Sequence, residues 1–327
     1  METKWNPTGK PLAISNTPVG RNPEQEPTAK AGARVEGSRA IQKQRARPTG
    51  GAALRADRSA EARVARAHGL KTLSLQTGII YGPVPSRRLG LSLGINLLPT
   101  SYKLCSFNCI YCQYGWTKKP TLSLVNQLKD LPAVDEVAAE LETSLRQLAH
   151  GGEKIDSVTI CGNGEPTLYP DLADVIETAK RLRDRYQPQA RVAILSNSST
   201  VGAKAVRDAL DLLDLKIMKF DAGSEEMFRR LNHPVAPIYM GEIVAGLKEL
   251  KNIFLQSLFV QGRVTNADPD SIAMWIERVR DIRPLAVQVY TLDREPADKK
   301  IEKVSPATLQ WIANQVRWRA GVPVDVF

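Results

Sequence analysis

Short β-rich runs alternate with helix-forming segments along most of this 327-residue chain. The helical segments carry apolar residues at the i, i+3, i+4 and i+7 spacing of amphipathic helices, most clearly within 134–148, 172–182 and 272–279. Six β-rich runs lie between or beside them, at 91–98, 155–161, 191–196, 213–220, 253–260 and 285–292. Because crossover helices join parallel strands, this alternation predicts an α/β fold of parallel β-α units.

Six strands are too few for a complete eight-stranded barrel, so we expect an open, partial barrel or a wound sheet. In either case the functional site should lie at the C-terminal ends of the strands. Asp268–Pro269 and Ser305–Pro306 each pair an N-cap residue with a proline in the first turn. These dipeptides predict the starts of two of the helices.

The first 75 residues differ from the rest in composition and charge. They are rich in Pro, Gly, Ala, Lys and Arg, and hold 14 basic and six acidic residues, whereas residues 76–327 hold 31 and 29. This composition predicts a disordered basic extension over 1–75. A short basic helix within it, and contact with RNA or another acidic partner, remain open. We expect a core barrel at 76–302, with a C-terminal helix and short extended segment at 303–327 packed on it.

The chain contains no run of about 18 apolar residues, so we expect no transmembrane helix. Its first residues also lack the apolar stretch of a secretory signal. These two features predict a cytoplasmic protein that makes no membrane contact.

Three of the four cysteines, Cys105, Cys109 and Cys112, lie within eight residues in a CxxxCxxC spacing. In a long chain without a secretion signal, such clustering favours a metal site over a disulfide framework. Thiolates are soft ligands that suit iron–sulfur clusters or zinc. The segment follows the first predicted strand, where a barrel active site belongs. Three thiolates on a cubic cluster would leave one iron for a non-protein ligand.

The fourth cysteine, Cys161, ends the second predicted strand. It could complete the ligand set of a non-catalytic electron-transfer or metal-binding protein with a closed site. Alternatively, it could be a small buried hydrophobic residue, which the apolar strand around it favours.

The turn that follows this strand has the sequence GNGEPTL, from Gly162 to Leu168. Its two glycines permit positive φ angles and a close approach of backbone to a ligand. Backbone groups there could hold an ammonium or a carboxylate, with Glu165 supporting the loop. Such a turn is ordinary on its own, but it comes one β-α unit after the cysteine segment.

The cysteine motif, with Tyr111 before its last cysteine, and the GNGEP turn together resemble the radical S-adenosylmethionine (SAM) superfamily over residues 78–325. Segments 81–90 and 288–294 resemble a narrower group, the uncharacterised iron–sulfur oxidoreductases related to the enzymes that build the wyosine base in tRNA. The resemblance implies a partial (β/α)6 TIM-like barrel. It also implies an enzyme in which the three clustered cysteines ligate a 4Fe–4S cluster and SAM chelates the fourth iron.

In the reaction that this resemblance implies, the reduced cluster cleaves SAM to methionine and a 5′-deoxyadenosyl radical, which abstracts hydrogen from a substrate. A flavodoxin or ferredoxin is the expected electron donor. RNA, a small metabolite and a protein radical site are all open as substrates. The relation to wyosine synthesis and the basic extension favour RNA, whereas the near-neutral charge of residues 76–327 opposes it.

The resemblance further implies a set of SAM-contacting positions that follow the strands. They are Tyr111 and Tyr290 near the adenine, with Val289 beside it; Gly162, Asn163, Gly164 and Glu165 at the SAM amino group; Ser196 and Asn197 near the ribose or carboxylate; and Lys219, Asp221 and Gln256.

Arg87 and Arg88 precede the first predicted strand. Arginine forks suit an anionic substrate, the SAM carboxylate or nucleic-acid phosphates. Ion pairs on the closed end of the barrel would explain these arginines equally well.

Overall fold

The computed structural model describes residues 72–118, 120–122, 128–235 and 237–327. The chain divides into two units, 1–59 and 60–327, and only the second contains described residues. The basic extension predicted for 1–75 therefore lies outside the described residues, apart from 72–75. In that short stretch, the Leu73 N–H donates to the Gln113 carbonyl at 2.8 Å.

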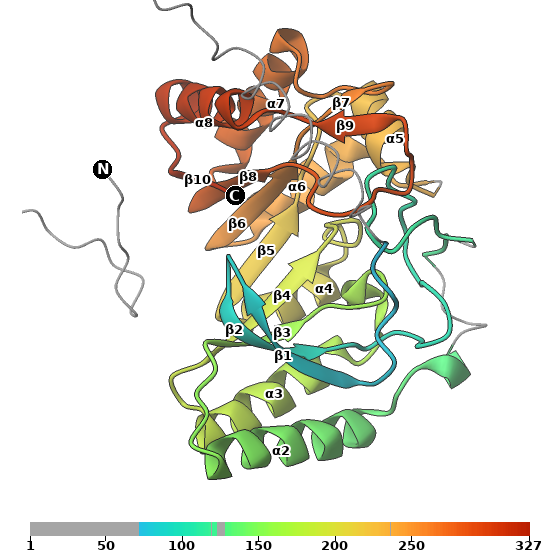
Figure 1. Ribbon diagram of the computed structural model, residues 1–327, viewed down its shortest axis with the longest axis vertical. Helices are drawn as coiled ribbons and strands as arrows, with labels where there is room; N and C mark the ends of the chain where they lie inside the picture. Colours follow the sequence, from blue (N-terminus) through green and yellow to red (C-terminus); the bar gives the residue numbers. More distant parts are fainter. Residues whose placement is uncertain (1–71, 119, 123–127, 236) are drawn as a thin grey trace, which may run out of the picture. The chain divides into compact units, whose positions relative to one another are not determined.

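A central eight-stranded sheet has the order β1-β2-β3-β4-β5-β6-β8-β10 (Figure 1). All neighbouring strands are parallel except β1 and β2, which pair antiparallel. The strands are β1 (Ile80–Ser86), β2 (Gly90–Ile95), β3 (Ser157–Ile160), β4 (Arg191–Ser196), β5 (Leu215–Lys219), β6 (Ile253–Leu258), β8 (Ala286–Tyr290) and β10 (Val324–Val326). Strands β2 to β6 and β8 coincide with the six predicted runs, which confirms the partial (β/α)6 barrel.

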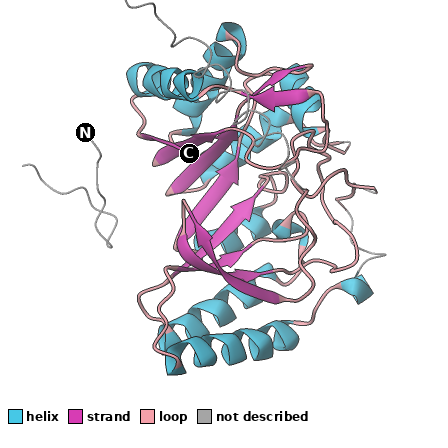
Figure 2. Ribbon diagram, viewed as in Figure 1, coloured by secondary structure: helices cyan, strands magenta, loops and turns pink. Residues whose placement is uncertain are grey.

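Helices lie outside the curved sheet, and many of the loops gather at one side of it (Figure 2). A separate two-stranded antiparallel sheet joins β7 (Val260–Gly262) and β9 (Ile301–Lys303). The helices are α2 (Val134–His150), α3 (Leu172–Tyr186), α4 (Lys204–Asp211), α5 (Glu225–Asn232), α6 (Met240–Glu249), α7 (Pro269–Ile282) and α8 (Pro306–Ala320), with short 3-10 turns η1 (Leu128–Asp130) and η2 (Pro166–Leu168).

The predicted apolar stripes are the buried faces of these helices. In α2, Val137, Leu141 and Leu145 are at most 1% exposed. Burial of each such side chain contributes roughly 1.5–3 kcal/mol, which exceeds what helix propensity alone provides. The predicted caps also form, because the carboxylate of Asp268 accepts the Ser271 N–H at 2.9 Å at the start of α7.

The turn between β1 and β2 enters the inside of the curved sheet. Leu89 is 4% exposed and packs on Ala193 of β4 and on Leu215 and Ile217 of β5. These positions alternate along their strands, so they share the inner face. Leu89 thereby closes one end of the partial barrel and brings Arg88 inside it.

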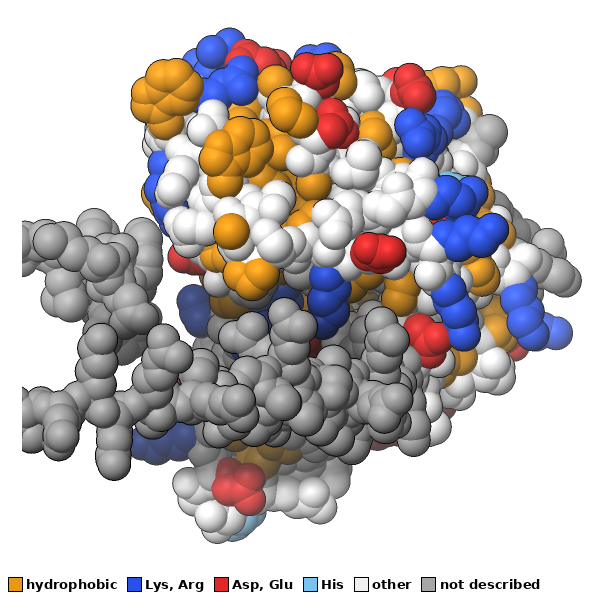
Figure 3. Space-filling view, turned by 45° about the horizontal axis from the view of Figure 1, so that its top comes forward, with side chains coloured by type: hydrophobic (Ala, Val, Ile, Leu, Met, Phe, Trp, Pro, Cys, Tyr) orange, Lys and Arg blue, Asp and Glu red, His pale blue; other side chains and the backbone are white. Residues whose placement is uncertain are grey.

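The C-terminal helix α8 packs against α7, β8 and β10. Exposed hydrophobic side chains gather at the upper left of Figure 3, where α8 lies in Figure 1. Trp318 of α8 is 81% exposed. Within the described residues, no helix combines the length and the apolarity needed to cross a bilayer.

Candidate functional site

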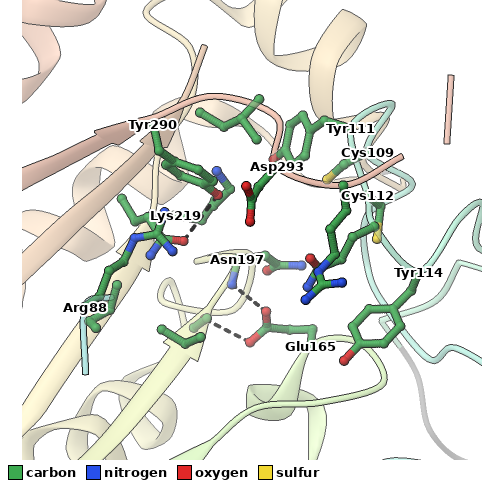
Figure 4. Close-up of a pocket in the computed structure, with 18 of the residues that line it drawn as sticks. Arg88, Cys109, Tyr111, Cys112, Tyr114, Glu165, Asn197, Lys219, Tyr290 and Asp293 are labelled. Carbon is green, nitrogen blue, oxygen red and sulfur yellow. Dashed lines mark hydrogen bonds between the residues drawn. The ribbon is translucent and has the colours of Figure 1, made fainter. Parts of the chain in front are cut away.

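A cavity of about 340 Å³ opens at the C-terminal ends of the parallel strands, the position expected for a barrel site (Figure 4). Its volume is within the range of small-molecule pockets. Twelve of the fourteen predicted site residues line it: Cys105, Cys109, Cys112, Tyr111, Gly162, Gly164, Glu165, Ser196, Asn197, Lys219, Gln256 and Tyr290. Residues from distant parts of the sequence therefore meet in one cavity.

The cysteine loop has little regular structure of its own and is held from two sides. On one side the Leu104 N–H donates to the Asn163 carbonyl at 2.9 Å, and Leu104 in turn accepts from the Glu165 N–H at 3.1 Å. On the other side, the Ile110 N–H donates to the carbonyl of Leu231 in α5 at 2.9 Å. The GNGEP turn and the end of α5 thus fix the loop through backbone contacts.

Gly164 has to be glycine for this contact to form. Its φ angle is 149°, and a Cβ there would lie 1.6 Å from the Leu104 carbonyl oxygen. The backbone of the cysteine loop occupies the space that a side chain would need. Gly164 therefore allows the cysteine loop to lie against the GNGEP turn, in addition to leaving room for a ligand beside it.

Each of the three clustered sulfurs faces a nitrogen donor. The contacts are Lys103 Nζ to Cys112 Sγ at 3.2 Å, Asn197 Nδ2 to Cys105 Sγ at 3.5 Å, and Asn232 Nδ2 to Cys109 Sγ at 3.5 Å. Donors of this kind favour the thiolate over the thiol, since they interact better with negative charge.

These sulfurs fit a cluster that holds several irons. All three cysteines are free, and burial raises the pKa of Cys105 and that of Cys109, the latter to about 11. Buried thiolates therefore need cations beside them. Among the described residues, no three His, Cys, Asp or Glu side chains are grouped to hold a single metal ion. A cluster suits this arrangement better, because each thiolate then binds a different iron and the sulfurs need not converge.

Glu165 is a buried carboxylate that joins two turns. It is 1% exposed, and Oε1 accepts from the hydroxyls of Thr167 at 2.6 Å and Ser196 at 2.8 Å. Oε2 accepts from the Asn197 N–H at 2.5 Å (Figure 4). Burial raises the pKa of Glu165 more than these hydrogen bonds lower it. None of the ion pairs in the described part of the chain involves this carboxylate, so it can receive a cationic ligand group.

Asn163 and Asp221 lie outside the cavity lining. The Asn163 amide donates to the carbonyls of Gln76 and Pro99, each at 2.9 Å, and ties these segments to the GNGEP turn. Asp221 accepts from Lys219 Nζ at 2.6 Å and from the Tyr111 hydroxyl. Both side chains hold neighbouring residues in place.

Lys219 lies between two aromatic rings. Its Nζ is 4.8 Å from the centroids of both Tyr111 and Tyr290, which permits cation–π contacts. Burial lowers the pKa of Lys219, but the Asp221 carboxylate more than offsets burial, so the pKa is raised and the amine stays charged. The Tyr290 hydroxyl donates to Gln256 Oε1 at 3.3 Å (Figure 4).

Sequence reasoning did not identify Lys103 and Asn232 as neighbours of the cysteines. Lys103 is two residues before Cys105, so its proximity in sequence was a usable signal. Asn232 is 123 residues from Cys109, and no sequence pattern links them. Both adjacent arginines line the cavity. Arg87 is largely exposed and pairs with Asp293 at 3.5 Å, whereas Arg88 is half-buried and extends toward Lys219 and Tyr290.

Cys161 is not among the residues that line the cavity. Its Sγ lies 2.9 Å from the Tyr81 hydroxyl, and burial raises its pKa to about 11. A half-buried cysteine outside the cavity lining, beside a tyrosine hydroxyl, is closer to the second interpretation, a packed side chain, than to a cluster ligand.

Comparison with known proteins identifies the family. The Radical SAM superfamily model matches residues 100–253. A UPF0026 protein of Helicobacter pylori (strain J99) is 30% identical over 232 residues, which cover 69% of this chain and 70% of that protein. A GTPase Obg of Brachyspira hyodysenteriae is 31% identical over 255 residues, 77% of this chain. The chain spans only 35% of that relative's length.

Solved structures agree on the fold. A radical SAM methyltransferase from Sphaerobacter thermophilus has a TM-score of 0.54 at 14% identity, over 72% of this chain and 65% of that one. SuiB of Streptococcus suis, bound to S-adenosylmethionine, has a TM-score of 0.51 at 14% identity, over 84% and 55%. TYW1 with a lysine-pyruvate adduct bound has a TM-score of 0.47 at 17% identity, over 70% and 74%, which is too distant to bear on substrate. The chain belongs to the UPF0026 family of radical SAM enzymes, which use a 4Fe–4S cluster and SAM.

Proposed function

We propose that this protein cleaves SAM reductively at a 4Fe–4S cluster held by Cys105, Cys109 and Cys112, and acts on a substrate bound in the same cavity. The observation that carries the proposal is the composition of that cavity. Three free thiols, each beside a nitrogen donor, share it with the unpaired buried carboxylate of Glu165. When bound, the cluster and SAM supply an electron and a carbon radical that takes a hydrogen atom from the substrate.

The residues around the sulfurs have the role of stabilising thiolate charge. Lys103 is a cation and contacts Cys112, whereas Asn197 and Asn232 contribute neutral amide donors. Hydrogen bonds to sulfur ligands shift a cluster's reduction potential, so these three side chains set how readily an electron is accepted.

The residues on the opposite wall have the role of orienting SAM. Glu165 accepts the SAM ammonium, because it is an unpaired buried carboxylate beside the cysteine loop. Tyr111 and Tyr290 offer aromatic surfaces for the adenine, and Asn197 and Gln256 offer amides for the ribose or carboxylate. Asp221 positions Tyr111 and Lys219 from behind.

The inner end of the cavity excludes water from the reacting atoms. Leu195, Ile217 and Leu258 line its walls, and Leu89 closes its end. A carbon radical reacts with nearby hydrogen donors, so an apolar lining limits side reactions. This enclosure supports a radical reaction inside the barrel.

A flavodoxin or ferredoxin supplies the electron in this proposal. A second pocket, of about 640 Å³, is lined by Lys103, Tyr114, Trp116, Lys118 and Lys129, among other residues. Lys103 lines both pockets, so the outer one lies beside the cysteines. Its lysines and exposed Trp116 suit an acidic protein with a planar cofactor.

The donor site is tested with a charge reversal. The double variant Lys118→Glu and Lys129→Glu should slow SAM cleavage driven by reduced flavodoxin and leave dithionite-driven cleavage unchanged. Lys251→Glu, just before β6 and so at the other end of the strands, is the matched control. Equal loss with both reductants would contradict a docking role.

Charge distribution supports a small substrate over RNA. Residues 76–327 carry 31 basic and 29 acidic residues, whereas RNA-binding domains usually have a basic face. On the face drawn in Figure 3, acidic side chains lie among the basic ones. The four free cysteines favour a reducing compartment, so a cytoplasmic location is part of this proposal.

The function is tested by anaerobic reconstitution of the full chain with iron and sulfide. After reduction with dithionite and addition of SAM, chromatography should detect 5′-deoxyadenosine, and Cys109→Ala should yield none. A stable cluster that never cleaves SAM, even with cell extract present, would favour a non-catalytic electron-transfer protein.

A further inference from the structure

Arg88 is a half-buried cation that forms no ion pair within the described part of the chain. Its Nε and Nη2 atoms are buried and form no hydrogen bond, and none of the ion pairs among the described residues involves it. The carboxylate of Asp293 pairs instead with Arg87. Leaving a buried charged donor unsatisfied is destabilising, so a structural role does not explain why arginine stands here.

Two aromatic rings lie against the guanidinium of Arg88. Its Cζ is 4.3 Å from the ring centroid of Tyr290 and 4.8 Å from that of Phe327. Aromatic contacts of this kind stabilise the charge, but they do not satisfy the N–H donors at the edge of the group. Nε and Nη2 are covered by protein atoms, so Nη1 is the donor of this group that an anion in the cavity can reach.

The turn that carries Arg88 is well fixed. The Ser86 hydroxyl accepts the Arg88 N–H at 3.3 Å and the Leu89 N–H at 3.2 Å, and Leu89 is packed inside the sheet. The side chain extends into the cavity toward Lys219 and Tyr290, away from the cysteines (Figure 4). A rigid base and an oriented edge are what a preorganised ligand site needs.

The charges at this end of the cavity do not balance. Lys219 and Arg88 both contact the Tyr290 ring, at 4.8 and 4.3 Å. Asp221 pairs with Lys219 at 2.6 Å, and no carboxylate pairs with Arg88. One positive charge therefore remains for a ligand.

We infer that the guanidinium of Arg88 binds an anionic group of the substrate, a carboxylate or a phosphate. The inference rests on the proposed function, in which substrate and SAM share this cavity. Because Arg88 lines a cavity of about 340 Å³, a small molecule fits beside its guanidinium and an RNA backbone does not. The substrate is thus a small acid or a small phosphate ester.

The test measures anion binding to the full chain, reconstituted anaerobically and saturated with SAM. Inorganic phosphate and acetate serve as probes, and binding is followed by the rise in Tm with probe concentration. We expect at least one anion to stabilise the wild type, and Arg88→Gln to weaken that binding at least about tenfold. Arg185→Gln removes an exposed arginine that lies over the Tyr186 ring outside the cavity lining, and it should bind the anion as the wild type does. The anion that binds distinguishes a carboxylate from a phosphate.

Several outcomes would overturn the inference. They are the lack of any Arg88-dependent anion effect, the loss of SAM binding in Arg88→Gln, and Arg88-dependent binding of an RNA oligonucleotide in place of small anions. A lower Tm of Arg88→Gln without anion would indicate a structural role, because removing an unpaired buried charge should leave Tm equal or higher. Wild-type protein that binds the anion and never cleaves SAM would instead contradict the proposed function alone.

Discussion

The two ends of the cavity require ligands of opposite charge. At one end, three thiols face nitrogen donors, and burial raises the pKa of Cys105 and that of Cys109. At the other end, Arg88 lines the cavity and forms no ion pair with a carboxylate of the described residues. The cysteine end therefore needs cations, and the arginine end needs an anion.

This difference indicates how the protein distinguishes its ligands. Metal and SAM belong to the end that has sulfur and the Glu165 carboxylate, whereas a negatively charged substrate belongs to the end that has Arg88. A ligand with the wrong charge at either end would leave buried groups unpaired, which is more unfavourable than a weak contact is favourable. Four substitutions, each paired with a control variant, test this comparison.

The largest effect should come from replacing one of the three clustered cysteines, in contrast to Cys161. Cys112→Ala should lose most of its bound iron and reduce SAM cleavage to background, because one of the three thiols of the cavity is gone. Cys161→Ala should keep both, since its sulfur lies by Tyr81 outside the cavity lining. Iron and sulfide analysis and 5′-deoxyadenosine chromatography measure the pair. Loss of the cluster in Cys161→Ala would mean that the cysteine end has four ligands.

Gly164→Ala should displace the cysteine loop. The added Cβ would meet the Leu104 carbonyl oxygen at 1.6 Å, so the backbone has to move. We expect a loss of about 1–3 kcal/mol in the free energy of unfolding and a lower iron content. Gly115→Ala is the control, because its φ is 75° but its Cβ would meet no atom within 4 Å. Denaturant unfolding and iron analysis give the comparison, and equal effects would show that the loop contact is unimportant.

Glu165→Gln should weaken SAM binding roughly tenfold or more, because a neutral amide replaces the carboxylate proposed for the ammonium. Calorimetric titration with SAM measures this change, and iron analysis checks that the cluster is retained. Thr167→Val removes only the hydroxyl that donates to Glu165 at 2.6 Å, so it should have a smaller effect. If Glu165→Gln binds SAM as tightly as the wild type, the SAM ammonium binds a group other than Glu165.

The smallest effect lies far from either end, at the cap of α7. Burial raises the pKa of Asp268, but the hydrogen bond from the Ser271 N–H outweighs it, so the pKa is lowered. A lowered folded-state pKa contributes stability above the unfolded pKa, near 3.9, that is lost as the pH falls through the folded value.

Asp268→Asn keeps a capping oxygen but does not titrate. The wild type should be more stable than this variant by about 0.5 kcal/mol at neutral pH, because the partly exposed charge is screened. This advantage should vanish once the pH has fallen below the folded-state pKa of Asp268. Denaturant unfolding across pH measures it. Asp270→Asn, in the same turn without the capping contact, is the control. A pH-independent difference would exclude the charge as its cause.

The sequence predicted elements and motifs better than side-chain directions. Six strands and the CxxxCxxC loop follow from local periodicity and spacing, and the structure contains the strands where expected. Asn163 is in the GNGEP motif, yet its side chain binds Gln76 and Pro99 outside the cavity. A motif fixes which residues are present and leaves open which way each one points.

The neighbours of the reactive groups required the fold. Asn232 approaches Cys109 only because α5 ends beside the cysteine loop. Whether Arg88 is paired depends on Tyr290, Phe327 and Asp293, all about 200 residues away. Arg87 and Arg88 are equivalent in sequence, and packing alone separates a surface ion pair from a buried donor.

The two-sided attachment of the cysteine loop affects how the cluster would be loaded. Small zinc domains are unfolded without metal, so the free energy of metal binding has to offset the conformational entropy that is lost on folding. Here the backbone N–H groups of Leu104 and Ile110 are hydrogen-bonded to the GNGEP turn and to α5, so the loop is held by contacts other than the cluster ligands. Because these contacts do not involve iron, we expect the chain to keep its fold when iron is limiting and to take up the cluster in a loop that is already in place.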